Sequence, residues 1–454
     1  MYAMGSLWFE SALLPSGWAS RVRLTVREGC IASITPDTAP AADDQRHAIA
    51  VPGLPNVHSH AFQRGLAGLT ERRGAQADSF WSWRELMYRF IERLGPAELE
   101  AISALCFAEM LEAGFTQVGE FHYLHHDRDG RPFADVGELA VRVAAAAGAT
   151  GIGLTLLPVF YAHSGFGGAA PSARQQRFIT APDSFARLLE SCRRAVQSLP
   201  GARVGVAPHS LRAVTPAELS EVTALAPGAV VHIHIAEQER EVAECLAWCG
   251  ERPIRWLLAN QPVDERWCLV HATHATAAEL TAVAQRQAVV GLCPITEASL
   301  GDGIFPAQQF LAVQGRVGIG SDSNVLIDAA EELRTLEYSQ RLAVRARNVL
   351  ATRAEASTGR SLFEAALAGG RQALQGAGGL VPGASLDLVT LRARHPVLLE
   401  RHGDEILDSW IFAGGRSLID CVWRAGVLLV QDGRHRERAA LEARYAQALR
   451  VLRA

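Results

Sequence analysis

Histidine and carboxylate residues recur where apolar runs of the chain give way to polar loops. His58 and His60 lie two residues apart, so on an extended strand both side chains point the same way and can bind one ion. A catalytic metal needs about three protein ligands or slightly more, with a position left for water. His234 and Asp322, each following a later apolar run, would complete the set. The sequence therefore predicts a metal centre whose ligands come from distant segments.

Two further residues in the same kind of position predict hydrolytic chemistry. Glu237 lies just past His234, and its carboxylate could carry protons between water and substrate without binding the metal. His271 ends the next apolar run and could orient and polarise the same water, together with Asp322. A metal at this centre would lower the pKa of water from about 16 towards 7. We expect one zinc ion, although histidine and carboxylate ligands also suit iron.

Each residue taken alone has an ordinary structural interpretation. A lone His-x-His pair more often packs or faces solvent, and Asp322 could cap a turn or a helix. We interpret His232, which alternates with His234, as a core or supporting histidine, and His274 as structural or exposed. The joint placement of the other residues at the ends of apolar runs favours the metal site.

The segments that must position these residues alternate between short apolar runs and helical patterns, which is typical of a parallel (β/α)8 barrel. In such barrels the active site forms at the carboxyl ends of the strands. The expected helices between the strands include 96–114, 184–198, 238–248 and 275–287. The eight expected strands are 50–57, 116–121, 151–160, 203–207, 229–235, 268–270, 288–292 and 316–319.

The two chain ends do not continue this alternation. Residues 1–50 and 380–454 carry short alternating patterns, such as 22–26 and 421–426, and are expected to form one small β-sandwich domain with a C-terminal helix. The barrel is expected to occupy 51–379. The Gly- and Ala-rich stretch 165–173 follows the third expected strand and could cover the substrate.

Composition narrows the possible partners. The formal charge of -4 comes from mixed acidic and basic residues, so we expect neither nucleic acid nor a membrane as partner, and small molecules instead. The chain has no lysine, which excludes Schiff-base lysine chemistry and a metal pair bridged by a modified lysine. The start, residues 1–5, lacks the features of a signal peptide, so we expect a cytoplasmic protein.

Several motifs together resemble the amidohydrolase superfamily, in particular its single-metal deaminase branch. These motifs are 52–60, His234 with Glu237, His271, and 321–324. Four others, at 60–64, 81–84, 120–126 and 208–212, are similar to the N-formimino-L-glutamate deiminases of histidine breakdown. The resemblance implies deamination of N-formimino-L-glutamate to N-formyl-L-glutamate and ammonia, and a homodimer.

The resemblance also implies which residues bind the substrate. A dicarboxylate needs cationic, fork-shaped partners, and arginine supplies them. The residues implied to bind the substrate are Gln63, Arg84, Tyr123, His209 and Arg212.

Two other functions remain possible on this pattern. A related single-metal hydrolase could deaminate an aromatic heterocycle such as guanine, or act on a chlorinated triazine, and would need stacking surfaces more than paired arginines. A catalytically inactive scaffold of the same fold is the second, and the complete set of expected ligands, Glu237 and His271 argues against it.

Overall fold

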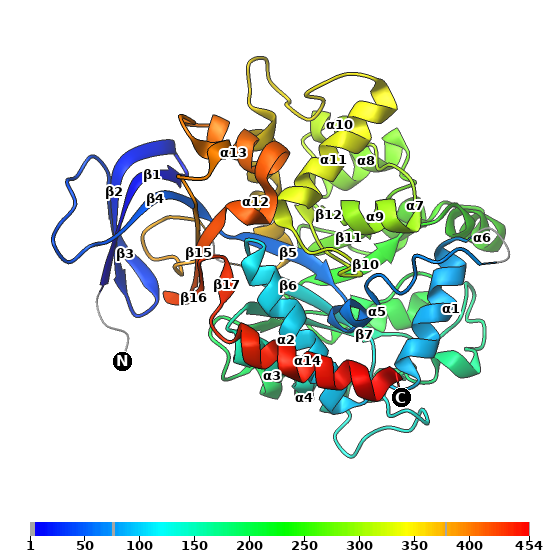
Figure 1. Cartoon of the computed structure of the whole chain (residues 1–454). Helices are drawn as coiled ribbons and strands as arrows, with labels where there is room; N and C mark the ends of the chain where they lie inside the picture. Colours follow the sequence, from blue (N-terminus) through cyan, green and yellow to red (C-terminus); the bar gives the residue numbers. More distant parts are fainter. Residues whose placement is uncertain (1–4, 75–77, 377–378, 454) are drawn as a thin grey trace.

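The structure is a computed structural model that describes residues 5–74, 78–376 and 379–453. The sequence led us to expect no signal peptide at the start of the chain. Residues 1–4 of that segment lie outside the described residues. Two bodies are visible in Figure 1: a small sheet at the left and a larger body in which strands are surrounded by helices.

The larger body is a parallel barrel. Its strands follow the order β10-β11-β12-β13-β5-β6-β7-β8, and two isolated parallel bridges, Val206 to Val231 and Ser210 to His234, connect the last strand region back to the first. Almost every residue of these strands is buried, as expected when helices cover the outside of a parallel sheet. The fold predicted from the sequence is therefore confirmed. The strands are β5 (Leu54–Ser59), β6 (Phe115–His122), β7 (Gly153–Phe160), β8 (Arg203–Val204), β10 (Val231–Ile235), β11 (Trp267–His271), β12 (Val289–Leu292) and β13 (Arg316–Ile319), with β9 (Ala207–Pro208) paired to β7.

Helices connect these strands and cover the barrel. Proline occupies the first position of several of them, where its missing N–H and fixed φ are tolerated. All four helical segments expected from the sequence are present, with ends shifted by a few residues. The helices are α1 (Phe80–Ile91), α2 (Pro96–Glu112), α3 (Glu138–Thr150), α4 (Pro182–Val196), α5 (Pro216–Ala224), α6 (Glu239–Cys249), α7 (Pro253–Asn260), α8 (Ala277–Gln285), α9 (Pro294–Leu300), α10 (Ala307–Ala312), α11 (Ala329–Val344), α12 (Thr358–Ala373), α13 (Glu405–Ser409) and α14 (Arg438–Arg453).

The segment 50–57, expected to be one strand, is divided between the two bodies. Gly53 separates the small-sheet strand β4 (Gln45–Pro52) from the barrel strand β5. A Cβ atom at Gly53 would lie 2.2 Å from the Thr116 side chain, so the crossing point is too tight for a larger residue. The expected strand 203–207 is likewise broken into β8 and β9.

The small sheet is built from both ends of the chain. Its order is β17-β16-β15-β14-β4-β1-β2-β3, so the hydrogen bonds form one continuous sheet where two sheets of a sandwich were expected. A separate apolar cluster, formed mainly by residues of its own strands such as Phe9, Leu24 and Trp423, is its core. The remaining strands are β1 (Gly5–Leu14), β2 (Gly17–Arg27), β3 (Cys30–Thr35), β14 (Leu388–Leu391), β15 (Ile419–Arg424), β16 (Val427–Gln431) and β17 (Arg434–His435).

The C-terminal helix α14 differs from its expected place in the β domain. It lies along α2 of the barrel, as Figure 1 shows at the bottom of the molecule. Arg438 pairs with Glu109 and Glu112 of α2 at 3.1 and 2.8 Å, while Leu441 and Leu452 are buried. The physical reason is that α14 has both an apolar side and arginines that match the acidic residues of α2. Among the described residues, no helix is both long and apolar enough to span a membrane.

Candidate active site

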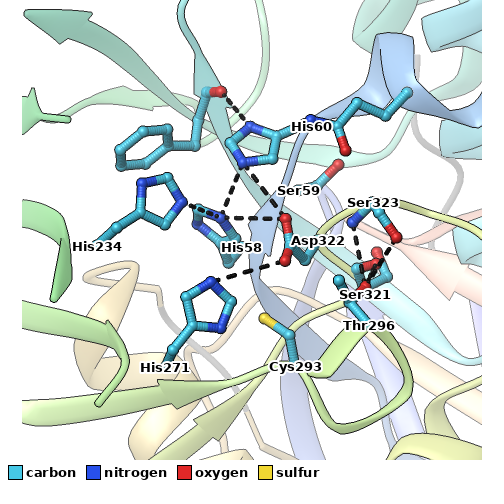
Figure 2. A network of polar contacts seen from close by, with 12 residues as sticks. His58, Ser59, His60, His234, His271, Cys293, Thr296, Ser321, Asp322 and Ser323 are labelled. Atoms are coloured by element: carbon cyan, nitrogen blue, oxygen red, sulfur yellow. Dashed lines mark hydrogen bonds and ion pairs between the residues drawn. The ribbon is translucent and has the colours of Figure 1, made fainter. Parts of the chain in front are cut away.

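The predicted metal ligands meet at the carboxyl ends of the barrel strands. His58 lies near the end of β5, His60 directly after it, and His234 near the end of β10. Asp322 follows β13, and its backbone forms a bridge to Ser59. All four side chains are buried and converge in Figure 2.

The distances between their donor atoms fit one metal ion. His58 Nε2 lies 3.2 Å from His60 Nε2 and 3.0 Å from His234 Nε2. Asp322 Oδ1 lies 3.3 Å from His60 Nε2 and 3.6 Å from His58 Nε2. Two donors bound to one zinc ion at about 2.1 Å with a tetrahedral angle would lie about 3.4 Å apart. These distances match the spacing of ligands around one zinc ion. His58, His60 and Asp322 form one group of potential metal ligands, and His58 joins His234 and His271 in a second.

The hydrogen bonds of the imidazoles support the same conclusion. Nδ1 of His60 donates to the carbonyl of Phe121 at 2.8 Å, and Nδ1 of His234 donates to the carbonyl of His209 at 3.1 Å. These bonds leave the Nε2 lone pairs facing each other, which is repulsive unless a cation lies between them. Burial lowers the pKa of His58 to about 3, so its ring is neutral, as a metal ligand must be.

Glu237 and His271 lie beside this cluster on the cavity side. Nε2 of His271 lies 3.9 Å from Glu237 Oε1 and 3.7 Å from Asp322 Oδ2. Burial raises the pKa of Glu237 to about 7, against the opposing effect of His271 and Arg212. Burial alone would lower the pKa of His271, but Glu237, Glu297 and Asp322 outweigh it and raise the pKa to about 10. A carboxyl group that can gain or lose a proton near neutral pH thus faces a nearby imidazolium.

Sequence reasoning missed the residue that holds His271 in place. Glu297, in the first turn of α9, accepts a hydrogen bond from Nδ1 of His271 at 3.2 Å and one from the Cys293 amide at 2.9 Å. This contact fixes the ring so that Nε2 faces Glu237 and Asp322. The only sequence signal is an acidic residue five positions after the end of the apolar run 288–292, which many helix starts share.

A buried amide network holds the loop that carries Asp322. Asp322 has φ +42°. Nδ2 of Asn324 donates to the carbonyl oxygens of His60 and Asp322 at 3.1 and 2.9 Å, and Ser321 Oγ donates to Asn324 Oδ1 at 2.6 Å. Asn56 Nδ2 in turn donates to Ser321 Oγ at 2.7 Å. The motif 321–324 was singled out from the sequence, but the hydrogen bonds by which Asn56, Ser321 and Asn324 support Asp322 were not predicted.

The five residues implied to bind substrate line one cavity with the cluster. This cavity reaches from the candidate metal site to helix α1. Gln63 Nε2 donates to the Tyr123 hydroxyl at 2.8 Å, and both residues are buried. The residues that line this cavity include His60, Gln63, Arg84, Tyr123, His209, Arg212, His234, Glu237, His271 and Asp322.

The two arginines stand on different elements of the cavity wall. Arg84 belongs to α1, and Arg212 follows β9 and is 7% exposed. The Nε atoms of both are buried and have no hydrogen-bond partner among the described residues. His209, from the same segment as Arg212, lies against His234 with ring centroids 4.9 Å apart, and burial lowers its pKa far below the usual value. The cavity therefore presents two cations whose hydrogen-bonding capacity is partly unused.

The other histidines considered from the sequence lie outside this arrangement. Nε2 of His232 donates to the carbonyl of Ala373 at 2.8 Å, and its side chain lies two residues further than His234 from the carboxyl end of β10. His274 is half-buried and is absent from the described residues that line the cavity. The glycine-rich stretch proposed as a cover is tied to α6 by the stacked rings of Phe166 and Trp248, 5.6 Å apart. None of its residues is among those that line the cavity in the described part of the chain.

Comparison with known proteins places this geometry in a family. Residues 49–426 match the Amidohydrolase family, so the chain belongs to that family. Residues 5–48 match the N-terminal domain of formimidoylglutamate deiminase HutF. The formimidoylglutamate deiminase of Pseudomonas aeruginosa is 51% identical over 95% of this chain and 96% of that protein. Within the amidohydrolases, the chain is thus a member of the formimidoylglutamate deiminase group.

Solved structures agree with the observed fold. An amidohydrolase from Brucella melitensis has a TM-score of 0.96 and 54% identity, covering 99% of this chain and 100% of that one. An adenosine deaminase from Xanthomonas campestris with bound zinc has a TM-score of 0.81 at 23% identity, covering 99% of both chains. This second likeness supports the barrel and its small sheet alone.

Proposed function

We propose that this chain hydrolyses N-formimino-L-glutamate to N-formyl-L-glutamate and ammonia in the breakdown of histidine. One observation carries the proposal: a single cavity joins the four-residue metal site, Glu237 and His271 to two arginines with unused donors. A substrate with one amidine group and two carboxylates matches this cavity, because the amidine can lie at the metal site and the carboxylates at the arginines. The relative from Pseudomonas aeruginosa is a formimidoylglutamate deiminase by name.

The arginines explain the choice of a dicarboxylate. A guanidinium group can donate two parallel hydrogen bonds to one carboxylate, which fixes both the position and the orientation of the substrate. Arg84 and Arg212 would bind the carboxylates, while Gln63, Tyr123 and His209 would supply polar contacts closer to the metal site. With the carboxylates held there, the formimino carbon would face Glu237 and His271.

The metal we propose is one zinc ion per chain, held by His58, His60, His234 and Asp322; iron suits the same ligands. When bound, it supplies Lewis acidity that makes water a nucleophile near neutral pH. The protein residues do the remaining work. His271, fixed by Glu297, orients the water and favours loss of its proton.

Glu237 moves the protons that the reaction requires. Water adds its oxygen to the formimino carbon, and Glu237 gives a proton to the terminal imino nitrogen. The carboxyl can hold that proton because burial raises its pKa to about 7. The remaining proton of that water, delivered to the same nitrogen, allows the carbon–nitrogen bond to break, so ammonia leaves. The water oxygen stays on the formyl carbon, which remains bonded to the glutamate nitrogen.

Release of ammonia from different substrates tests this function. The cavity wall also contains aromatic residues, among them Trp83, Tyr88 and Phe178, which would suit a heterocycle. We would therefore compare N-formimino-L-glutamate with guanine, cytosine and adenosine, using zinc-loaded protein. We expect rapid release from the first substrate alone. Release from a heterocycle, with none from formiminoglutamate, would leave the hydrolytic site in place and overturn the substrate assignment.

A further inference from the structure

Three guanidinium groups surround the ring of Trp81, a residue of α1 that lies outside the cavity. The Arg84 Cζ atom lies 4.7 Å from the ring centroid, that of Arg240 4.4 Å, and that of Arg212 5.8 Å. The three arginines come from α1, from α6 and from the segment after β9. Trp81 thus contacts cations of all three segments.

Burial disfavours the charge of Arg212, but the nearby carboxylates Glu241, Glu237 and Glu244 outweigh it and raise the pKa of Arg212. The ring of Trp81 is a further attractive partner for this cluster of like charges. Each guanidinium within about 6 Å of an indole centroid is attracted by the electron-rich face of the ring. Arg240 also pairs with Glu244 at 2.7 Å, but the buried Nε atoms of Arg84 and Arg212 have no partner among the described residues. A carboxylate in place of the ring would neutralise the two arginines and compete with the substrate. The ring can hold them and leave their charge available.

The position of Trp81 lets it hold the arginines without binding the substrate itself. Phe80, Trp83 and Arg84, its neighbours on α1, line the cavity, whereas Trp81 is absent from the described residues that do so. Arg240 is exposed on α6 and contacts the same ring from the barrel. The contact therefore also ties α1, which covers the cavity, to α6.

From these contacts we propose that Trp81 is a positioning residue that holds Arg84 and Arg212 for the recognition of two carboxylates. Arg240 secures the ring from α6. The inference rests on the proposed function for the identity of the substrate, although the recognition of a dicarboxylate can be measured without turnover. Removing the ring should weaken binding in the ground state and the transition state alike, so it should raise KM and leave kcat nearly unchanged.

The test compares W81L with W81F and with the control R89A. Leucine removes the aromatic face, and phenylalanine keeps a weaker one. Arg89 is an exposed arginine of the same helix and is absent from the described residues that line the cavity. The readouts are KM and kcat for N-formimino-L-glutamate and for N-formimino-L-2-aminobutyrate, which lacks the distal carboxylate. Zinc content and thermal unfolding of each variant identify any general damage.

We expect W81L to raise KM for the dicarboxylate about tenfold, W81F about threefold and R89A not at all, with kcat within about twofold throughout. The KM of the monocarboxylate should rise less in W81L. An unchanged dicarboxylate KM in a folded, zinc-loaded W81L protein would overturn the inference. So would equal losses for the two substrates, because Trp81 would then support the helix and not the arginines. If W81L does not fold, the ratio of the two KM values in W81F decides.

A binding measurement keeps this inference separate from the proposed function. Calorimetry with N-formyl-L-glutamate gives the dissociation constant of a dicarboxylate whether or not the wild-type protein releases ammonia from formiminoglutamate. Without turnover, a dissociation constant about tenfold weaker in W81L would uphold the role of Trp81 and reject only the proposed reaction. If the wild-type protein neither turns over formiminoglutamate nor binds N-formyl-L-glutamate, both the proposed reaction and the role of Trp81 would be rejected.

Discussion

The two sides of the cavity are held together by different means. On the metal side, His58, His234 and Asp322 stand at strand ends and are fixed by backbone bridges and buried amide contacts. On the opposite side, Arg84 and Arg212 stand on a helix and a loop and contact an aromatic ring. In the proposed function, the barrel would supply the reaction chemistry, and the segments that carry Arg84 and Arg212 would select the substrate. Substitutions on the two sides should therefore change different kinetic constants.

The largest expected effect is on the metal side. In E237Q the amide cannot transfer a proton, so we expect kcat to fall about 10³-fold while KM and zinc content stay close to the wild-type values. Steady-state ammonia release and metal analysis provide the measurement. The matched control is E239Q, an exposed carboxylate two residues away that should have no effect. A loss of less than tenfold in E237Q would show that another group transfers the proton.

Substitution on the arginine side should lower affinity instead. We expect R212M to reduce kcat/KM for N-formimino-L-glutamate about 10²-fold, mainly through KM, since a charge-assisted hydrogen-bond pair is lost. Kinetics with the same variant and N-formimino-L-2-aminobutyrate sharpen the comparison. If Arg212 binds the α-carboxylate, both substrates should suffer equally; if it binds the distal one, only the dicarboxylate should. A kcat defect with unchanged KM would contradict the separation of the two sides.

A smaller effect should follow from loosening His271. In E297Q the ring loses a charged acceptor but keeps a neutral one, so we expect kcat to fall about tenfold with zinc content retained. The loss of a nearby negative charge destabilises the imidazolium form and lowers the pKa of His271. The limb of the pH–kcat profile that His271 governs should accordingly move to lower pH. A limb that stays in place would mean that Glu297 does not act through this ring.

The smallest effect on turnover is expected in the small sheet. Arg23 hydrogen-bonds Asp44 and lowers the pKa of that carboxyl to about 2, and Ser6 and the Ala41 amide also donate to it. Because the folded-state pKa lies below the unfolded value of about 3.9, the stabilisation is complete above pH 4 and disappears as the pH falls through 2.

We expect D44N to leave kcat and KM unchanged and to lower the thermal midpoint by about 1–2 °C at neutral pH. Scanning calorimetry of the wild type and D44N should show the difference shrinking between pH 4 and pH 2. A difference that is constant over this range would mean that the ion pair does not stabilise the sheet.

The sequence predicted the barrel, and the residues that it assigned to the metal side lie close together, because both depend on local patterns. Apolar runs end in polar residues at each strand end, and His58 and His60 share one side of an extended strand. The break at Gly53 was missed because the run 50–57 is apolar throughout, and only the approach of Thr116 reveals the crossing between bodies. The packing of α14 on α2 was missed for a similar reason, since its partner lies far away in sequence.

The supporting residues of the site could not be predicted from local patterns. Glu297 and Asn324 act through contacts with residues 26 and 264 positions away, respectively. Arg84 was found only through a family resemblance, since nothing in its own segment indicates that α1 covers the cavity. The roles of the substrate-binding residues, the homodimer and the cytoplasmic location stay predictions.

A crystal structure of the zinc-loaded protein with N-formyl-L-glutamate would test most directly whether both sides act on one molecule. We expect one zinc ion between His58, His60, His234 and Asp322. We expect the formyl group beside Glu237, and the two carboxylates within hydrogen-bond distance of Arg84 and Arg212. A product bound with its carboxylates away from both arginines, or a metal at other ligands, would contradict this expectation.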